Sequence, residues 1–166
     1  MSLNRIKTLV AGATGFVGLD LVYLLSKHPN VKIKYLCAKK NIGKKINSFD
    51  KRIKKKLPKI SNIRSAKLSE IDLIFLALPN GEAQRMINKI YTKYPNIKFI
   101  DLSADFRIDN PKIYKKFYGL KHKAVNLIKF SVYAISEFVK ENLKKKNNSM
   151  SRLLSNIYTN SLNTFT

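Results

Sequence analysis

The feature that most constrains the fold is a glycine-rich turn near the start of the chain. Residues 5–11 end in a short apolar run, Gly12-Ala13-Thr14-Gly15-Phe16-Val17-Gly18 follows, and apolar residues then recur at helical spacing from Leu21 to Leu25. This order predicts a strand, a tight turn and a helix. Residues 28–30, His-Pro-Asn, end the helix. Residues 31–37 alternate apolar and basic side chains and end in Leu36 and Cys37, which predicts a second strand.

The same alternation of strand and helix continues along the chain. Residues 72–78 form a continuous apolar run of the kind that is buried on both faces of a parallel sheet, and Pro79-Asn80-Gly81 closes it. Residues 82–94 carry apolar side chains on one helical stripe, and residues 98–102 predict another short strand. The sequence therefore predicts an α/β fold with a Rossmann-like, doubly wound and mostly parallel sheet.

The pattern is less regular beyond this point. Pro111 can open a helix that runs to Tyr118 and ends at Gly119, and residues 136–146 also have a helical pattern. Residues 147–166 are rich in Ser, Asn and Thr and contain no acidic residue. We expect residues 1–146 to form an NAD(P)-binding Rossmann-like domain and residues 147–166 to be a disordered or out-of-frame tail.

The composition limits the partners and the setting of the protein. The 166 residues carry 33 Lys and Arg against 10 Asp and Glu, a net charge of +23, which fits a nucleic-acid binder. The basic stretch 44–59 lacks regularly interleaved aromatic residues, however, and Lys, Ile and Asn all have A+T-rich codons, so we interpret it as a solvated surface and expect no nucleic-acid partner. A single cysteine, Cys37, and no export signal or membrane span predict a cytoplasmic protein without a membrane partner, a disulfide or a metal site.

The glycines predict a site for a dinucleotide. Gly12 permits the tight turn, Gly15 lets the backbone approach a pyrophosphate, and Gly18 allows the helix to pack on the strand. Amides at the start of the helix would meet the phosphate charge. A purely structural turn is the alternative. The predicted cofactor-binding residues in this turn are Gly12, Ala13, Thr14, Gly15, Phe16 and Val17.

The end of the second strand indicates which dinucleotide binds. NAD-binding proteins place an acidic residue there to bind the ribose 2′-hydroxyl, but this chain has Cys37-Ala38-Lys39-Lys40. Lys39 and Lys40 could neutralise a 2′-phosphate, which favours NADP, although two ordinary surface lysines remain the alternative. Ala77, Leu78 and Pro79 follow a strand end where ligands of such sheets bind, and we expect backbone contact with the dinucleotide there.

Three motifs together resemble a known family. The glycine turn, Leu76-Ala77-Leu78-Pro79-Asn80-Gly81 and Asp101-Leu102-Ser103-Ala104-Asp105-Phe106-Arg107 are similar to the cofactor half of N-acetyl-γ-glutamyl-phosphate reductase, and the last motif is the specific one. The resemblance continues through residues 114–119, His122 and residues 132–137, with Ala134 where the family usually has glycine. It covers about residues 5–146.

The resemblance implies an NADPH-dependent reduction in arginine biosynthesis, from N-acetyl-γ-glutamyl phosphate to N-acetylglutamate semialdehyde. In that chemistry a cysteine thiolate attacks the small-molecule acyl phosphate, phosphate leaves, and hydride from NADPH releases the aldehyde. Ser103 and Arg107 are implied to bind the anionic substrate. An ion pair from Arg107 to Asp105 or Asp109 is the alternative. Full-length members of the family are homo-oligomers.

The family's catalytic residues are not found at matching positions. Its cysteine lies in a Pro-Gly-Cys-Tyr-Pro segment soon after the region that matches Glu137, and its basic histidine lies in a second, catalytic and dimerising domain. Cys37, at a strand end, is expected to be a buried inert thiol. We therefore expect the second domain to be absent, no catalytic residue in this chain, and no activity from it alone. There are two alternatives. The chain could be the cofactor domain of an aspartate-semialdehyde or lysine-pathway dehydrogenase, or it could be a non-catalytic dinucleotide-binding module.

The tail offers an explanation for the missing cysteine. One allowed set of codons for residues 147–161, read after omission of its first base, encodes Ile-Ile-Val-Cys-Pro-Gly-Cys-Tyr-Pro-Thr-Ser-Ile-Gln-Thr. This contains the missing segment, with the codon of its nucleophile straddling Leu153 and Leu154. We hypothesise that the gene is frameshifted or misread, and that its last residues are out of frame.

Overall fold

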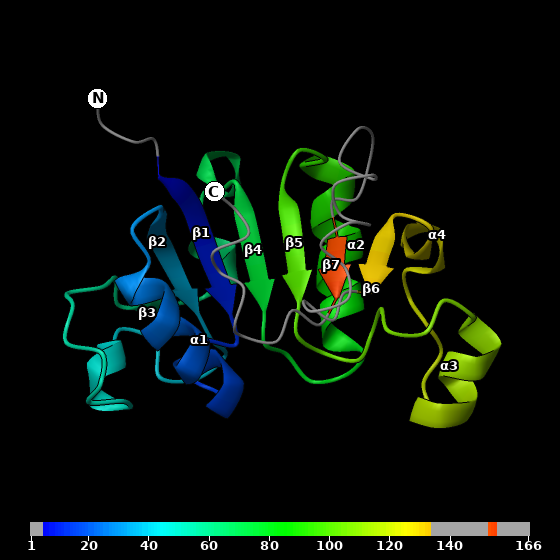
Figure 1. The fold of residues 1–166 in the computed structure, drawn as a ribbon, viewed down its shortest axis with the longest axis horizontal. Helices are drawn as coiled ribbons and strands as arrows, with labels where there is room; N and C mark the ends of the chain where they lie inside the picture. The colour runs from blue at the N-terminus through cyan, green and yellow to red at the C-terminus, as the bar shows by residue number, and fades with distance from the viewer. Residues whose placement is uncertain (1–4, 134–152, 156–166) are drawn as a thin grey trace. The chain divides into compact units, whose positions relative to one another are not determined.

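Figure 1 presents the computed structural model of the chain, which describes residues 5–133 and the backbone of residues 153–155. The chain divides into two compact units, Met1–Ala77 and Leu78–Phe165, each of which is described on its own. No helix within the described ranges has the length and apolar character needed to cross a membrane.

The first unit is built on four parallel strands. These are β1 (Ile6–Ala11), β2 (Val31–Cys37), β3 (Ile60–Ser61) and β4 (Leu73–Leu76), in the order β3-β2-β1-β4. Helix α1 (Phe16–Lys27) connects β1 to β2, and its side chains Leu21, Val22 and Leu25 are buried. The predicted strand, turn, helix and second strand are thus confirmed (Figure 1).

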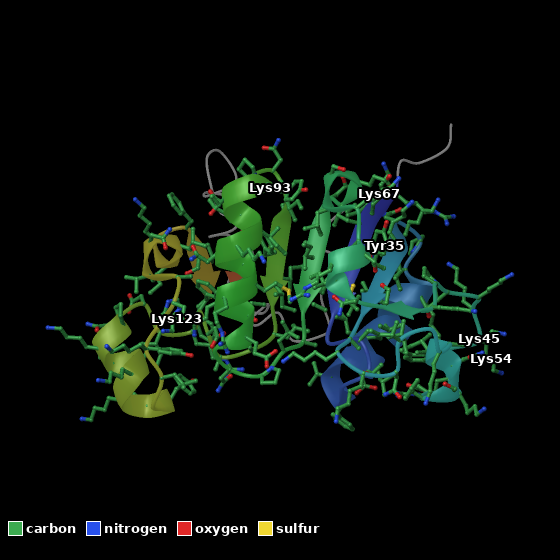
Figure 2. The ribbon with its side chains drawn as sticks, turned by 180° about the vertical axis from the view of Figure 1, so that it is seen from behind. Tyr35, Lys45, Lys54, Lys67, Lys93 and Lys123 are labelled. Atoms are coloured by element: carbon green, nitrogen blue, oxygen red, sulfur yellow. The ribbon has the colours of Figure 1, made fainter. Side chains whose placement is uncertain are left out.

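The basic stretch 44–59 is folded, although no regular element was predicted in it. It contains the short 3₁₀ helix η1 (Ile46–Ser48), and the side chains of Ile46 and Ile53 are 2% and 1% exposed. Lys45 and Lys54 extend outward from this stretch, as Figure 2 shows. The buried side chains of Ile46 and Ile53 therefore fix the backbone of the stretch, while its lysines are exposed to water, as expected for a solvated basic surface.

The sequence pattern predicts no helix or strand between β3 and β4 either. Two further 3₁₀ helices, η2 (Ile63–Ser65) and η3 (Leu68–Glu70), lead from β3 to β4. Both are single turns, and such turns leave little periodicity in a sequence. The backbone N–H of Lys7 donates to the Asp72 carboxylate at 2.7 Å and so fixes the entrance of β4 beside β1.

The described residues of the second unit form three helices and three strands. The elements are α2 (Glu82–Lys93), β5 (Lys98–Asp101), α3 (Pro111–Tyr118), α4 (Val125–Ile128), β6 (Ser131–Tyr133) and β7 (Leu153–Ser155). Strand β7 pairs in parallel with both β5 and β6. Helix α3 has the predicted bounds because the Asn110 side chain accepts from the N–H groups of Lys112 and Ile113, while Gly119 ends it at φ +68°. The parallel strands and connecting helices confirm the predicted Rossmann-like α/β fold.

Strand β7 corrects part of the prediction for residues 147–166. The backbone of Leu153–Ser155 pairs with Phe99–Asp101 of β5 on one side and Ser131–Tyr133 of β6 on the other, so these three residues are not disordered. Three residues are too few to show a period in the sequence, and their conformation comes from the strands beside them. The predicted helix 136–146 and the rest of the tail lie outside the described residues, and the out-of-frame hypothesis stays a prediction.

Candidate functional site

The glycine turn takes the sharp path that its sequence predicts. It leaves β1 at Gly12, which has a φ of +83°, a conformation that side chains other than glycine rarely adopt. The N–H groups of Gly12 and Ala13 both donate to the carbonyl oxygen of Cys37, at 2.9 and 3.1 Å. The turn is therefore fastened to the carboxyl end of β2, where the predicted lysines follow.

Gly18 and Gly15 have different roles in this turn. A Cβ at Gly18 would lie 2.0 Å from the carbonyl oxygen of Gly12, so α1 packs against the turn at a distance that only glycine allows. A Cβ at Gly15 would lie 3.4 Å from that same oxygen, which is an ordinary contact. The fold therefore requires glycine at position 18, whereas it would tolerate a side chain at position 15.

The start of α1 is suited to an anion. Its cap residue Gly15 has no side chain to satisfy the first amides, and the first turn contains no acidic residue. Phe16 and Val17, the first two helical residues, are 86% and 46% exposed. These features fit the pyrophosphate of a dinucleotide, because its charge would meet the backbone N–H groups at the start of a helix.

The predicted 2′-phosphate residues follow β2 directly. Lys39 and Lys40 are exposed, and the loop that carries them is tied to β3 by a hydrogen bond of 3.1 Å from the N–H of Ala38 to the carbonyl oxygen of Ser61. Cys37 is 3% exposed, and burial raises the pKa of its thiol to about 11. The structure thus confirms the prediction of a buried thiol, and at neutral pH the protonated thiol is not a nucleophile.

The residues predicted after β4 are divided between the two units. The N–H of Ala77 donates to the carbonyl oxygen of Ala11 at 2.9 Å, which places Ala77 beside the glycine turn within the first unit. Leu78 and Pro79 begin the second unit. Within that unit the loop they belong to contacts the predicted substrate loop, because the N–H of Ala104 donates to the Asn80 side chain at 3.3 Å.

The predicted substrate residues lie on the loop after β5. Arg107 is exposed, but Ser103 is only 7% exposed. The Ser103 hydroxyl donates to the Asp101 carboxylate at 2.9 Å and accepts from the N–H of Asp105 at 3.1 Å. Ser103 therefore holds the loop together, and its direct contact with a substrate stays a prediction.

Asp101 anchors this loop from a buried position. Its carboxylate is fully buried and also accepts from the N–H of Ser103 at 2.9 Å. Burial raises the pKa of Asp101 to about 6, while the hydrogen bonds from Ser103 act in the opposite direction. The charge of this carboxylate is therefore costly to the fold near neutral pH.

Asp105, on the loop after β5, is bound to the loop that precedes α2. Its carboxylate accepts from the N–H of Gly81 at 2.7 Å, from the N–H of Gln84 at 3.0 Å and from the hydroxyl of Tyr114 at 2.6 Å. The first amides of α2 are thus bound by a carboxylate of this chain. Burial and the hydrogen bond to Asp105 raise the pKa of Tyr114, so its hydroxyl stays a donor.

Gln84 and His122 extend the same buried network. The Gln84 side chain donates to the Tyr114 hydroxyl at 3.0 Å and accepts from the N–H of Lys123. His122 Nδ1 accepts from the N–H of Ala124 at 3.2 Å, so Nε2 carries the proton and donates to the carbonyl oxygen of Asp105 at 2.8 Å. Burial lowers the pKa of His122, which keeps the ring neutral.

This network is not predicted by the sequence. An ion pair with Arg107 was the alternative considered for Asp105, and His122 was part of the resemblance only. The partners of Asp105 lie 21 to 24 residues earlier, at Gln84 and Gly81, and 9 residues later, at Tyr114. The burial of an acidic residue within the Asp-Leu-Ser-Ala-Asp-Phe-Arg motif could not be read from spacing, because the motif alternates too irregularly to define a buried face.

The sequence has relatives of known name over most of its length. The profile of the family described as "Semialdehyde dehydrogenase, NAD binding domain" matches residues 7–146. The chain is 45% identical over 143 residues to the N-acetyl-gamma-glutamyl-phosphate reductase of Ehrlichia ruminantium, covering 85% of this chain and 40% of that protein. It is 41% identical over 135 residues to the reductase of the same name from Brachyspira hyodysenteriae, covering 81% of this chain and 38% of that protein. The chain thus spans about 40% of the length of these relatives.

Solved structures show the same fold in more distant proteins. An aspartate semialdehyde dehydrogenase II from Vibrio cholerae matches with a TM-score of 0.62 at 18% identity, covering 92% of this chain and 38% of that one. An aspartate semialdehyde dehydrogenase with NADP from Candida albicans matches with a TM-score of 0.55 at 18% identity, covering 91% of this chain and 42% of that one. At this level of identity the likeness concerns the fold.

Proposed function

Since the chain belongs to the family of semialdehyde dehydrogenase NAD-binding domains, we propose that it is the NADP-binding part of an N-acetyl-γ-glutamyl-phosphate reductase. The identity of 45% to a curated reductase of that name is the observation that carries the proposal. It favours this reductase over the aspartate-semialdehyde alternative, because the aspartate semialdehyde dehydrogenases reported above share only the fold at 18% identity.

The glycine turn and the start of α1 would hold the pyrophosphate. The backbone of residues 12–17 offers amides in a tight turn, where a Cβ at Gly15 would make an ordinary contact of 3.4 Å with the Gly12 carbonyl oxygen. Backbone groups of Ala77, Leu78 and Pro79 would line the path of the dinucleotide. When bound, the dinucleotide supplies the hydride for reduction of an acyl phosphate.

Lys39 and Lys40 would select NADP over NAD. Both ammonium groups lie on the loop after β2, where the ribose of a dinucleotide is bound in this fold, and no acidic residue is present there to bind a free 2′-hydroxyl. An ammonium group attracts a phosphate as a point charge. Arg107, exposed on the loop after β5, would attract the anionic acyl phosphate, with Ser103 holding that loop.

The chain lacks the nucleophile that this reaction needs. Its one cysteine is Cys37, whose thiol is buried and protonated, so we expect binding without reduction from this chain alone. A soluble cytoplasmic setting and small-molecule ligands follow from the same proposal. Residues 1–146 would form the cofactor domain, and residues 147–166 would be read out of frame.

Titration of the purified chain with NADPH and NADH tests the proposal. We expect NADPH to bind in the micromolar range, about −8 kcal/mol, and NADH to bind at least about tenfold more weakly. Binding of neither dinucleotide by folded protein would refute the proposed cofactor site. Reduction of N-acetyl-γ-glutamyl phosphate by this chain alone would refute the proposed lack of activity.

A further inference from the structure

The loop that carries Lys39 and Lys40 is held by β3. The N–H of Gly43 donates to the carbonyl oxygen of Ile60 at 2.8 Å, and the N–H of Ile60 donates to the carbonyl oxygen of Lys44 at 2.9 Å. Asn41 and Gly43 have φ angles of +64° and +84°, so the loop turns sharply before it reaches these bonds. The positions of the two lysines therefore depend on where β3 lies.

Strand β3 is too short to hold itself in place. It consists of Ile60 and Ser61, which pair with Leu36 and Cys37 of β2. Two residue pairs at the edge of a sheet supply few hydrogen bonds, so the register of β3 depends on the residues that lead into it. Those residues are the basic stretch 44–59.

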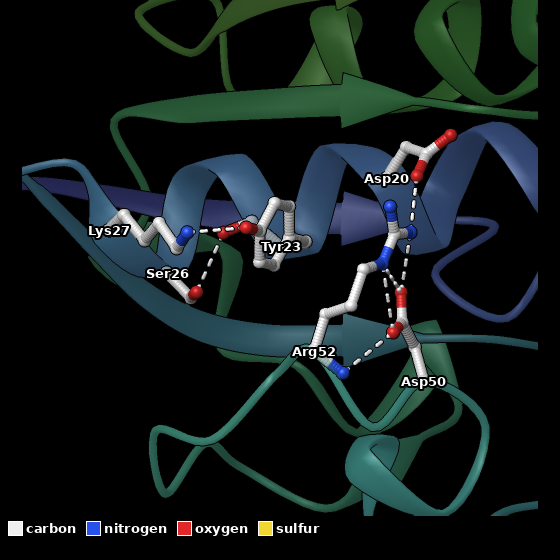
Figure 3. Close-up of polar contacts among 6 residues, drawn as sticks. All are labelled: Asp20, Tyr23, Ser26, Lys27, Asp50 and Arg52. Carbon is white, nitrogen blue, oxygen red and sulfur yellow. Dashed lines mark hydrogen bonds and ion pairs between the residues drawn. The ribbon is translucent and has the colours of Figure 1, made fainter.

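Arg52 fastens this stretch to α1, as Figure 3 shows. Its Nε donates to both carboxylate oxygens of Asp50, at 3.1 and 3.0 Å, and its Nη2 donates to Asp50 at 2.7 Å and to Asp20 of α1. The guanidinium carbon also lies 4.9 Å from the centroid of the Tyr23 ring, which is on α1. A planar guanidinium that contacts two carboxylates and an aromatic ring holds the two segments in a more definite orientation than a lysine ammonium would.

A second contact joins the stretch to α1 further along the helix. Lys55 Nζ donates to the carbonyl oxygen of Ser26 at 3.3 Å, one residue before the end of α1. The stretch is thus fastened to α1 at two places, and α1 begins at the glycine turn. Of the two contacts, only that of Arg52 joins several charged groups at short distances.

We propose that Arg52 is a positioning residue for the selectivity between NADP and NAD. Ile46 and Ile53 bury residues 44–59 against the unit, and Arg52 adds the directional contact with α1; together they keep β3 in register, and β3 keeps Lys39 and Lys40 at the carboxyl end of β2, where a 2′-phosphate would lie. This inference rests on the proposed function and adds to it a residue that does not itself touch the dinucleotide.

The ratio of NADPH to NADH affinity distinguishes positioning of the lysines by Arg52 from a general electrostatic effect of the Arg52 charge. Arg52 also neutralises Asp20, which lies on the second turn of α1. Without Arg52, the uncompensated Asp20 carboxylate would repel the pyrophosphate. NADPH and NADH share the pyrophosphate, so that effect weakens both. Only NADPH carries the 2′-phosphate, and the ratio of the two dissociation constants therefore reports the lysine loop.

The test measures dissociation constants of NADPH and NADH for the wild-type chain, Arg52→Ala, Arg52→Lys and Lys34→Ala. We expect Arg52→Ala to lower the preference for NADPH about tenfold, which corresponds to about 1.4 kcal/mol, and Arg52→Lys to lie between. Lys34→Ala is the control, because it likewise removes one cation of the same unit; it breaks one ion pair, that with Glu70 at 3.6 Å, whereas Arg52→Ala breaks two. Lys34→Ala should leave the ratio within about twofold of the wild type.

Each outcome decides for or against the inference. A wild type that prefers NADPH, together with an Arg52→Ala variant that keeps the same ratio, overturns it while the proposed function stands. A wild type that binds neither dinucleotide overturns both. In the K39A/K40A background the effect of Arg52→Ala on the ratio should vanish, and a persistent effect contradicts action through the lysines. If Arg52→Ala does not fold, Asp20→Asn breaks only the arm to α1 and should lower the ratio in the same direction.

Discussion

A methyl group added at Gly18 should unfold part of the site, whereas a side chain added at Gly15 should spare the fold. The Cβ of Gly18→Ala would lie 2.0 Å from the Gly12 carbonyl oxygen and 2.9 Å from its carbon, both of them backbone atoms. Real Cβ atoms stay beyond 3.0 Å, so the turn and α1 must separate by about 1 Å. Such overpacking costs up to about 3 kcal/mol, and the better helix propensity of alanine returns about 1 kcal/mol.

The net loss of about 2 kcal/mol should lower the midpoint of thermal unfolding by about 6 °C and abolish binding of NADPH. Gly15→Ser is the matched variant, because its Cβ would lie 3.4 Å from the same oxygen and serine is a good N-cap. Thermal unfolding should show unchanged or higher stability, but calorimetry should show a dissociation constant for NADPH raised at least about tenfold. A Gly18→Ala variant as stable as the wild type, or a Gly15→Ser variant that binds NADPH normally, would refute this account of the turn.

Three further predictions concern the buried network around Asp101, Asp105 and His122. Because burial raises the pKa of Asp101 from 3.8 to about 6, ionisation of Asp101 should lower the free energy of unfolding by about 3 kcal/mol as pH rises through that interval. Urea titrations at several pH values should show this dependence in the wild type and not in Asp101→Asn. An Asp101→Asn variant with the same pH profile as the wild type would count against it. The lowered pKa of His122 acts in the opposite direction, since His122 takes up a proton below pH 6.5 in the unfolded chain but stays neutral to lower pH in the folded chain. The free energy of unfolding should therefore fall as pH falls below 6.5, and it should fall less in His122→Gln. Asp105→Ala should cost about 4 kcal/mol in the same assay, because Gly81, Gln84 and Tyr114 lose their buried acceptor, and a loss below about 1 kcal/mol would contradict the assignment.

Resequencing tests the hypothesis for the tail. The DNA at codons 145–149 should permit the shifted reading that encodes the Pro-Gly-Cys-Tyr-Pro segment, and the adjoining DNA should continue in that frame. Codons that cannot yield the shifted reading would end the hypothesis. Strand β7 does not decide whether the tail is out of frame, because two adjacent leucines, Leu153 and Leu154, can join a sheet whatever reading frame encodes them.

Local signals made part of the fold predictable. The glycine turn, the cap at Asn110 and the stop at Gly119 each specify a backbone conformation within a few residues, so the elements beside them were found with nearly correct bounds. The strands β3 and β7 have two and three residues, and they exist because other strands lie beside them. Nothing in their own residues indicates this.

The candidate site was predictable to a similar degree. Gly12 to Val17, Lys39, Lys40 and Ala77 follow strand ends, and the carboxyl ends of parallel strands share one edge, so their proximity could be expected from the order of elements alone. The contacts of Asp105 and Arg52 could not, because each joins segments that are distant in the sequence through side-chain geometry. A lysine-rich composition also hid the anchors Ile46 and Ile53, which make stretch 44–59 a folded surface.

Thermal unfolding with and without dinucleotide tests the central claim most directly. A ligand that binds only the folded chain adds about 2.7 kcal/mol to the free energy of unfolding at a concentration one hundred times its dissociation constant. The account predicts a midpoint that rises by several degrees with NADP⁺ and by distinctly less with NAD⁺ at the same concentration. A cooperative transition whose midpoint stays unchanged with both would contradict it.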